Sequence, residues 1–573
     1  MPSPEFQTSY VRMSLGVTLE EDHRKGADTA MVKASESTQT KGPTTKMAIY
    51  HRWGIPIGIA TVGLILNTIV ALNMAETIDE PVHVSYGAEI LKGSPDRSRV
   101  IRYDSTMPAS ALNALPRAVS KALRRMGLGL GIAGKLRDFR IARFPTIFAA
   151  FALCLLVYLY AESLYGRLAG LLAQVVFIIS PNIIAHSTLA TTDLYSALAT
   201  VMFLYCLRSF LLKPGVATAT LAACTLAAAQ LTKFSAPFLY LALPIIVFPY
   251  LLYSRYDGNR PRLTSRHVGT LLALHIVFFI LLINVAFSFD RTFTALANYE
   301  FHSTLLRIAQ QVPVLRTIPL PLPYAYLQGL DLMSYHNVNG LSFGNIVLLG
   351  RVRGPELGGL SGFGAYYLLA YALKEPLGMQ VLLLLSLLWI ANNRRLANFL
   401  TGEWLLLATA GVLLLMLSFF SNVQIGIRHI LPVLSIFVIL SGRACLDCLR
   451  SSWRRVLLSG CLLWTVVSVG TYFPHMIPYF NEILTDRKMA YRLLADSNLD
   501  WGQDSWEVQT FLQNNGDVAL DPPQPVAGRI LVSANLLAGV QPKRADYWLR
   551  RTSEKPIAQV GYAHVLFFVP ARK

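Results

Sequence analysis

The sequence predicts an all-α polytopic membrane protein of about eleven transmembrane helices, with helices in its external loops and a small α/β extramembrane domain at its C-terminal end. Of its 573 residues, 53% are hydrophobic and only 15% are charged, a composition typical of membrane proteins. Eleven apolar stretches are long enough, or nearly long enough, to cross a bilayer. They are residues 53–74, 143–161, 167–185, 194–212, 216–233, 237–254, 268–289, 366–390, 403–420, 427–442 and 455–473.

These stretches divide the chain into three parts. Residues 1–50 are polar and read as a disordered cytoplasmic arm. Residues 51–473 form the predicted transmembrane domain, which includes a first external loop at 75–142 and a second at 290–365. Residues 474–573 form the predicted external domain, in which the runs RILVSANLLAG and YAHVLFFVP are expected to be strands.

Basic residues in the short loops predict the orientation. With eleven spans these loops fall on one side, which the positive-inside rule makes cytoplasmic. The N-terminus is then cytoplasmic and the C-terminus is outside, which is the periplasm if this is a bacterial inner-membrane protein. The net charge of +18 is explained by these loops and by lipid phosphates, so we expect no nucleic-acid partner. The loop residues are Lys41, Lys46, Arg52, Arg255, Arg260, Arg262, Arg266, Arg394, Arg395, Arg443, Arg450, Arg454 and Arg455.

The two long external loops have distinct patterns. In the first, Leu112, Leu115, Val119 and Leu123 recur at helical spacing among basic residues, which predicts an interfacial helix kinked at Pro116; a solvated basic loop is the alternative. The second is rich in Tyr, Phe, Gly and His. Its length without strong structure of its own, together with its aromatic content, indicates a functional loop.

Two adjacent carboxylates, Asp79 and Glu80, follow the first span by about five residues. Acids placed where a span meets water are costly unless they face a cavity. One could act as general base on an attacking hydroxyl while the other orients a sugar hydroxyl or a metal. The alternative is a helix cap or an ion pair with a loop arginine. His83 could add a ligand, but one His with two acids is a weak metal signal.

Further candidates lie at the outward ends of later spans. Asp193 opens the fourth span beside His186 and would bind substrate if it faces the same cavity as Asp79; otherwise it is a helix N-cap. Lys233 and Arg428, with His429, lie at the depth of a lipid head group and could hold a phosphate as negative charge develops on it. Snorkelling to the interface is the alternative.

Three acids recur every four residues in the tail segment DSNLDWGQD. On a helix, Asp496, Asp500 and Asp504 would align on one face. A solvated face is the default interpretation. Calcium binding or docking onto the arginine-rich loop is the alternative.

The order of these motifs resembles that of a known family. The external Asp79-Glu80 pair, the amphipathic basic loop, the HSTLATTD segment and IGIRHILP resemble membrane glycosyltransferases of the protein O-mannosyltransferase type, over about residues 50–480. The tail from YFNEIL to DSNLDWGQD resembles that of bacterial phospholipid-carrier-dependent members. The resemblance implies the C-type glycosyltransferase fold. It assigns Asp79 as the catalytic base with Glu80 as its neighbour, Arg428 as a lipid-phosphate contact, and Asp193 as a less constant acid.

The implied activity is inverting transfer of a hexose or pentose from a polyprenyl-phosphate carrier to an acceptor hydroxyl at the non-cytoplasmic face. The acceptor is a glycan, lipid or protein, although the second loop carries none of the extra folded module of eukaryotic protein mannosyltransferases. No metal ligands are assigned and a divalent ion stays possible as a cofactor. A transporter or lipid-linked glycan flippase, or a ligase or polymerase that uses a diphosphate-linked donor, is the alternative.

Overall fold

A computed structural model describes residues 45–97, 105–127, 138–256, 262–339, 344–354, 357, 362–393 and 395–571. The chain divides into two compact units, Met1–Ile55 and Pro56–Lys573, and the second contains nearly all of the described elements. The predicted arm, residues 1–50, lies almost wholly outside the described residues.

All eleven predicted apolar stretches are helical. The helices that correspond to them are α2 (Thr45–Leu72), α6 (Phe144–Tyr165), α7 (Arg167–Ile179) with α8 (Pro181–Ser187), α9 (Asp193–Leu212), α10 (Val216–Ala229), α11 (Phe238–Tyr256), α12 (Ser265–Ala286), α16 (Tyr366–Lys374) with α17 (Leu377–Asn393), α19 (Glu403–Phe419), η5 (Ile427–Ile430) with α20 (Leu431–Ser441), and α22 (Ser452–Gly470). Short helices α18 (Leu396–Leu400) and α21 (Arg443–Cys448) join some of them.

The number of spans is lower by a strict criterion. Among the described residues, six helices are long and apolar enough to cross a membrane, or up to eight if each of two bent pairs counts as one span. The helices α10 and α19 are apolar but shorter, and α22 is helical without meeting the criterion. The class, an α-helical multi-pass membrane protein, is confirmed, whereas the count of about eleven stays a prediction.

The two bent pairs have a local cause. The pair α7 and α8 bends by 67° at Ser180-Pro181, and the pair α16 and α17 bends by 118° around Pro376. Proline lacks the backbone N–H and disfavours a helical residue before it. At the first bend, Ser180 accepts a hydrogen bond from the backbone N–H of Ile183 and so starts the new helix.

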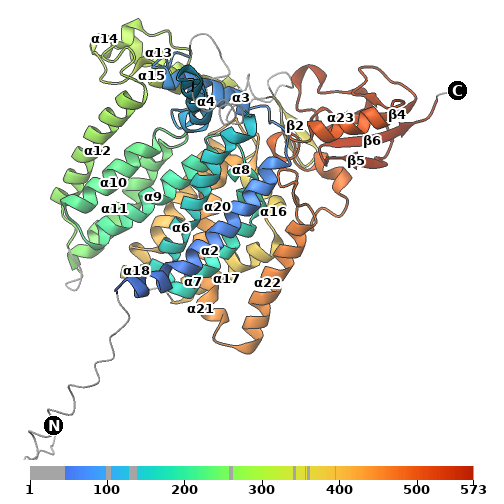
Figure 1. Cartoon of the computed structure of the whole chain (residues 1–573). Helices are drawn as coiled ribbons and strands as arrows, with labels where there is room; N and C mark the ends of the chain where they lie inside the picture. Colours follow the sequence, from blue (N-terminus) through green and yellow to red (C-terminus); the bar gives the residue numbers. More distant parts are fainter. Residues whose placement is uncertain are drawn as a thin grey trace, which may run out of the picture. The chain divides into compact units, whose positions relative to one another are not determined.

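The external segments collect at one end of the helices. Figure 1 shows α18 and α21 near the lower end of the helices. At the upper end lie α3 (Glu80–Leu91), α4 (Ser110–Arg125) and the helices of the second loop. The second loop is more structured than its sequence predicts. It contains η3 (Leu296–Asn298), α13 (Thr304–Gln311), α14 (Pro313–Thr317), α15 (Tyr324–Asn339) and the antiparallel strands β1 (Ile346–Leu348) and β2 (Arg351–Arg353).

The predicted interfacial helix is present as α4, which continues across Pro116. Leu112, Leu115 and Val119 are exposed on it, so none of the residues that the structure describes covers these three side chains. That exposure agrees with a helix that lies on a membrane surface, and its contact with lipid stays a prediction.

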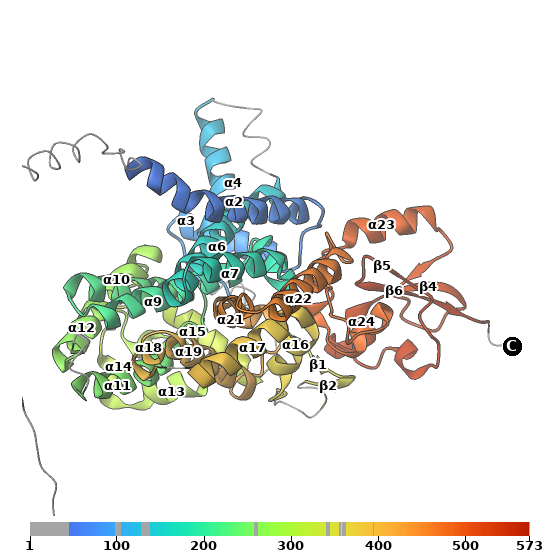
Figure 2. The same cartoon turned by 90° about the horizontal axis from the view of Figure 1, so that it is seen from below.

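The C-terminal part contains a four-stranded sheet in the order β3-β4-β6-β5, of which β4, β6 and β5 are labelled in Figure 2. Both predicted strands are present, since β4 (Gly528–Ser533) pairs antiparallel with β6 (His564–Val569). The second half of the first run was predicted wrongly: residues Ala534–Ala538 form a short helix, α24, which ends at the left-handed Gly539. The remaining elements are η6 (Arg487–Arg492), η7 (Asp496–Asn498), α23 (Ser505–Asn514), β3 (Ala519–Leu520), η8 (Pro542–Arg544), η9 (Trp548–Arg551) and β5 (Ala558–Val560).

Candidate active site

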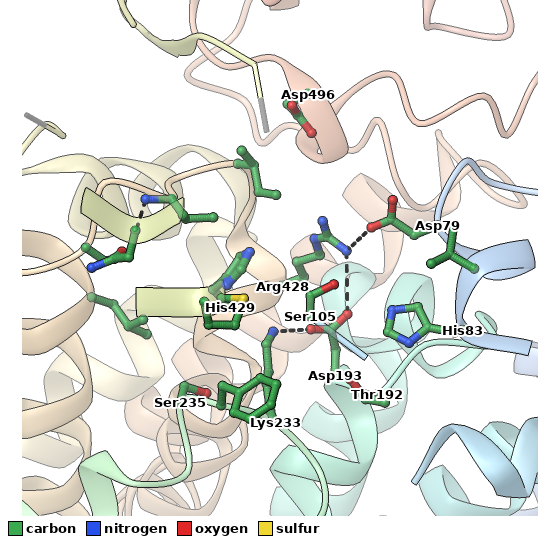
Figure 3. A pocket seen from close by; sticks show the side chains of 18 of the residues that line it. Asp79, His83, Ser105, Thr192, Asp193, Lys233, Ser235, Arg428, His429 and Asp496 are labelled. Atoms are coloured by element: carbon green, nitrogen blue, oxygen red, sulfur yellow. Dashed lines mark hydrogen bonds and ion pairs between the residues drawn. The ribbon is translucent and has the colours of Figure 1, made fainter. Parts of the chain in front are cut away.

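One cavity brings together most of the predicted site residues. It has a volume of about 880 Å³, and Figure 3 shows the polar side chains that face it. Of the residues that the sequence singled out, those that line it are Asp79, His83, Asp193, Lys233, Arg428, His429, Asp496 and Asp500. One part of its wall is apolar and includes Phe234, Phe238, Leu330, Met333, Met416 and Phe420.

A chain of four charged groups runs through the cavity. The guanidinium Nη1 of Arg428 donates to Oδ2 of Asp79 at 2.8 Å and lies 3.9 Å from Oδ2 of Asp193. The ammonium group of Lys233 pairs with the other oxygen of Asp193 (Figure 3). Two cations and two carboxylates therefore alternate, and their charges cancel before any substrate enters. Because each cation already has a fixed carboxylate partner, it is held in position for an incoming anion.

Asp79 is the most accessible of these carboxylates. It occupies the N-cap position of α3, and its side chain is 33% exposed, compared with 4% for Asp193. Its loop is held in place by the tail segment, because the backbone N–H of Ile78 donates to the carbonyl of Trp501 at 3.0 Å. Among the described residues, Arg428 binds Oδ2 of this carboxylate and no hydrogen bond is made to Oδ1.

Glu80 points elsewhere. Its carboxylate is buried and receives two hydrogen bonds from the fully buried Arg143, each of 2.7 Å. It also accepts the backbone N–H groups of Thr77 and Ala190, both at 2.9 Å. Since Thr77 precedes Asp79 and Ala190 precedes Asp193, Glu80 ties together the two loops that carry the cavity acids. The position of Glu80 suits a positioning residue and leaves it no opening toward the cavity.

Arg143 completes this anchor at the end of the first span. Its guanidinium donates to the backbone carbonyls of Ala71, Met74 and Ala75 at 2.7–2.8 Å. These carbonyls follow or close the last turn of α2, where helices lack internal donors. The ion pair with Glu80 thus fixes where the chain leaves the span and enters the loop of Asp79.

The histidines occupy three different settings. His83 lies on α3 with its Nδ1 3.2 Å from the hydroxyl of Ser110, and burial lowers its pKa, which keeps it neutral near pH 7. His429 lines the cavity, and its Nε2 has no hydrogen-bond partner among the described residues. His186 is not part of the cavity lining; its ring meets that of Trp501 edge-on at 6.1 Å.

The tail contributes a residue to the site that the sequence analysis did not single out, Trp501, and its three acids do not lie on one helix. Trp501 lies against the guanidinium of Arg428 at 4.1 Å, a cation–π contact that orients the arginine. The predicted stripe of Asp496, Asp500 and Asp504 on one helix face is wrong, because helix α23 begins only at Ser505 and Asp496 lies in a separate turn. Asp504 instead pairs with His564, with 3.2 Å between Oδ2 and Nδ1.

Of these three acids, Asp496 and Asp500 line the cavity and Asp504 does not. Burial raises the pKa of Asp496 to about 7, although Arg428 opposes the shift. One carboxylate oxygen of Asp500 accepts a hydrogen bond from the hydroxyl of Ser533 at 2.6 Å. No group of three or more His, Cys, Asp or Glu side chains within the described ranges is placed to hold a metal ion.

A family model described as dolichyl-phosphate-mannose-protein mannosyltransferase matches residues 126–284. The resemblance inferred from the motifs is confirmed. The mannosyltransferase-like segment contains Asp193 and Lys233, whereas Asp79, Arg428 and Asp496 lie outside it. The matched segment is less than half of the chain, and it shows similarity to a family whose named donor, dolichyl-phosphate-mannose, is a lipid-linked sugar. The multi-pass membrane class agrees with the apolar helices described above.

Comparison with curated proteins gives no match. Two crystal structures of ArnT from Cupriavidus metallidurans, one bound to undecaprenyl phosphate and one in the apo state, are 14% identical with a TM-score of 0.29. They cover 90% of this chain and 98% and 97% of their own chains. At this level of similarity they carry no argument about the fold or the residues of this chain.

Proposed function

We propose that this protein is an inverting glycosyltransferase, which moves a sugar from a polyprenyl-phosphate carrier to an acceptor hydroxyl at the non-cytoplasmic face of the membrane. The observation that carries the proposal is the pairing of Arg428 with both Asp79 and Asp193 in a cavity whose lining is partly apolar. A polyprenyl phosphate has the same two parts: an anionic head and a hydrocarbon chain.

The two cations suit the phosphate. Arg428 offers a planar set of donors and Lys233 a point charge, and Nε of Arg428 is buried without a partner among the described residues. His429 presents its unpaired Nε2 from the neighbouring position. When a phosphate oxygen binds Arg428, the guanidinium shares its charge between the phosphate and Asp79, so the carboxylate becomes a better proton acceptor than it is in the ion pair.

The reaction then needs one displacement. The acceptor hydroxyl transfers its proton to Asp79 as its oxygen forms the bond to the anomeric carbon. The bond from that carbon to the phosphate oxygen breaks, and the released phosphate carries the electron pair. Arg428 and Lys233 stabilise this developing negative charge. Attack from the side opposite to the leaving phosphate inverts the anomeric configuration, and no covalent enzyme intermediate is required.

The remaining predicted residues have supporting parts in this scheme. Glu80 positions the loops of Asp79 and Asp193, and Asp193 holds Lys233 in place. His83 lines the cavity as a neutral polar group close to Asp79. His186 packs against Trp501, and the ring of Trp501 contacts the guanidinium of Arg428. No step of the scheme depends on a divalent ion.

The test is incubation of the purified protein with a panel of radiolabelled polyprenyl-phosphate hexoses and pentoses in detergent or liposomes. We expect one of them to be consumed, with release of the free carrier phosphate and inversion at the anomeric carbon. Movement of an intact lipid-linked sugar across liposomes without release of carrier phosphate would instead indicate a flippase. Consumption of diphosphate-linked donors alone would indicate a ligase or polymerase.

A further inference from the structure

The tail places two further carboxylates, Asp496 and Asp500, in the cavity lining, and the proposed displacement uses neither. Asp500 already accepts a hydrogen bond from the hydroxyl of Ser533, which leaves Asp496 to be explained. Asp496 lines the cavity together with Asp79 and Asp193. Both of those acids have a cation as partner, whereas no cation forms an ion pair with Asp496 among the described residues. Figure 3 shows Asp496 on a separate segment, on the other side of Arg428 from Lys233.

The backbone at Asp496 is held in a costly conformation. Its φ is +58°, in the left-handed region that most residues avoid and that Asp and Asn tolerate best after glycine. The backbone N–H of Ser497 donates to Oδ1 of Asp496 at 2.6 Å, which stabilises this local turn. Non-glycine residues held in this region cluster at functional sites.

Tertiary hydrogen bonds lock the turn in place. The backbone N–H of Asp496 donates to Oδ1 of Asn535 at 2.7 Å. On the next two residues, Ser497 donates its hydroxyl to the carbonyl of Ile425 at 2.6 Å, and Asn498 accepts the backbone N–H of Ile427 at 3.0 Å. The turn is thus bound directly to the segment that leads into Arg428.

Buried Lys374 secures the same turn from the transmembrane side. Its ammonium group donates to the backbone carbonyl of Asn498 at 2.6 Å and to that of Ile477 at 2.7 Å. Because these hydrogen bonds fix the turn, the carboxylate of Asp496 loses little conformational entropy when it binds a ligand. Among the described residues, no hydrogen bond is made to its Oδ2, because the hydrogen bond from Ser497 uses Oδ1.

We propose that Asp496 is a donor-selecting residue that accepts hydrogen bonds from hydroxyl groups of the transferred sugar. The inference rests on the proposed function, which places the carrier phosphate at Arg428 and Lys233. The sugar is bonded directly to that phosphate, so its ring must lie close to Arg428. The turn of Asp496 is hydrogen-bonded to the residues just before Arg428. Carboxylate oxygens accept several hydrogen bonds at once, and a phosphate repels them, so Asp496 suits the hydroxyl face of the sugar and not the carrier head group.

The test separates sugar recognition from phosphate binding. The variant Asp496→Asn keeps the left-handed turn and an acceptor at Oδ1 but replaces the second acceptor oxygen with an amide donor. With the polyprenyl-phosphate sugar that the wild type consumes, we expect kcat/KM to fall at least tenfold. The Kd for undecaprenyl phosphate, which has no sugar, is expected to change less than twofold. Asp517→Asn is the matched control, because Asp517 is an exposed acid of the same part of the chain and should leave both values unchanged.

A second comparison uses donors that lack one hydroxyl at a time. One of these donors lacks the hydroxyl that Asp496 binds. Loss of that hydroxyl should lower kcat/KM strongly in the wild type but much less in Asp496→Asn, because the variant has already lost part of the hydrogen bond to it. Asp496→Gly, which also suits a positive φ, repeats the measurement if the Asn variant unfolds early in a thermal melt.

Three results would overturn the inference. One is equal loss of donor turnover and undecaprenyl-phosphate binding, which would mean that Asp496 acts only by holding Arg428. Another is an unchanged kcat/KM in both variants. The third is a deoxy-donor profile identical to that of the wild type. Failure of the proposed function is distinct, since the wild type itself would then consume no polyprenyl-phosphate sugar.

Discussion

Asp79 and Arg428 are 349 positions apart in the sequence, yet a guanidinium nitrogen of Arg428 lies 2.8 Å from a carboxylate oxygen of Asp79. Asp79 follows the first span, and Arg428 lies in the helix η5 that leads into α20. A proton acceptor and a phosphate-binding group therefore share one cavity. Substitutions around this pair can separate what each neighbour contributes to turnover, carrier binding and stability.

Arg428→Lys should reduce both donor turnover and carrier binding. A lysine ammonium is a point charge and cannot keep the contact with Asp79, the approach to Asp193 and the stacking on Trp501 at once. We expect kcat/KM to fall at least tenfold and the Kd for undecaprenyl phosphate to rise. Arg450→Lys is the control, because the Arg450 side chain is 73% exposed. Wild-type carrier affinity in Arg428→Lys would show that the phosphate binds elsewhere.

Glu80→Gln should lower stability more than it alters chemistry. The substitution leaves the fully buried Arg143 without its carboxylate partner, and breaking a buried ion pair in this way costs about 3–5 kcal/mol. Thermal unfolding in detergent measures the loss. The double variant Glu80→Gln with Arg143→Met should recover part of it, since no unpaired charge remains buried. An unchanged melting temperature together with lost turnover would instead return Glu80 to a direct catalytic role.

His564→Gln should destabilise the protein in a pH-dependent way. Burial opposes protonation of His564, but the hydrogen bond and charge of Asp504, with Asp500, outweigh it and raise its pKa. A raised pKa means that the charged pair stabilises the fold fully below about pH 6.5, the unfolded value, and that this contribution disappears as pH rises through the folded value. The variant should therefore lose about 1.5–3 kcal/mol at pH 5.5 and much less at pH 9. A difference that is constant across this range would contradict the assignment.

The sequence predicted the helices well because each apolar stretch carries its own signal. Hydrophobic runs identified eleven segments, all of which are helical. The bends at Ser180-Pro181 and Pro376 were visible as prolines, but their angles depend on packing that a one-dimensional pattern does not contain. The number of membrane crossings depends on the same bends, since each bent pair can count as one span or as a re-entrant segment.

Most residues of the site could be predicted from the sequence, but the different role of each residue could not. Position alone could not distinguish Asp79 from Glu80, because the partner that decides the matter, Arg143, lies 63 positions away. The four-residue spacing of Asp496, Asp500 and Asp504 imitates a helix, yet Asp496 and Gly502 both adopt positive φ and interrupt any helix there. Tertiary hydrogen bonds to Asn535 and Ile425 determine this turn, and no local pattern records them.

The most direct test of the central claim is the turnover of Asp79→Asn with the polyprenyl-phosphate sugar that the wild type consumes. A general base contributes roughly 100-fold to 10,000-fold, so we expect kcat to fall by at least 100-fold while undecaprenyl phosphate still binds and the exposed-acid control Asp546→Asn stays at the wild-type rate. An Asp79→Asn protein whose kcat remains within a few-fold of the wild type would contradict the account.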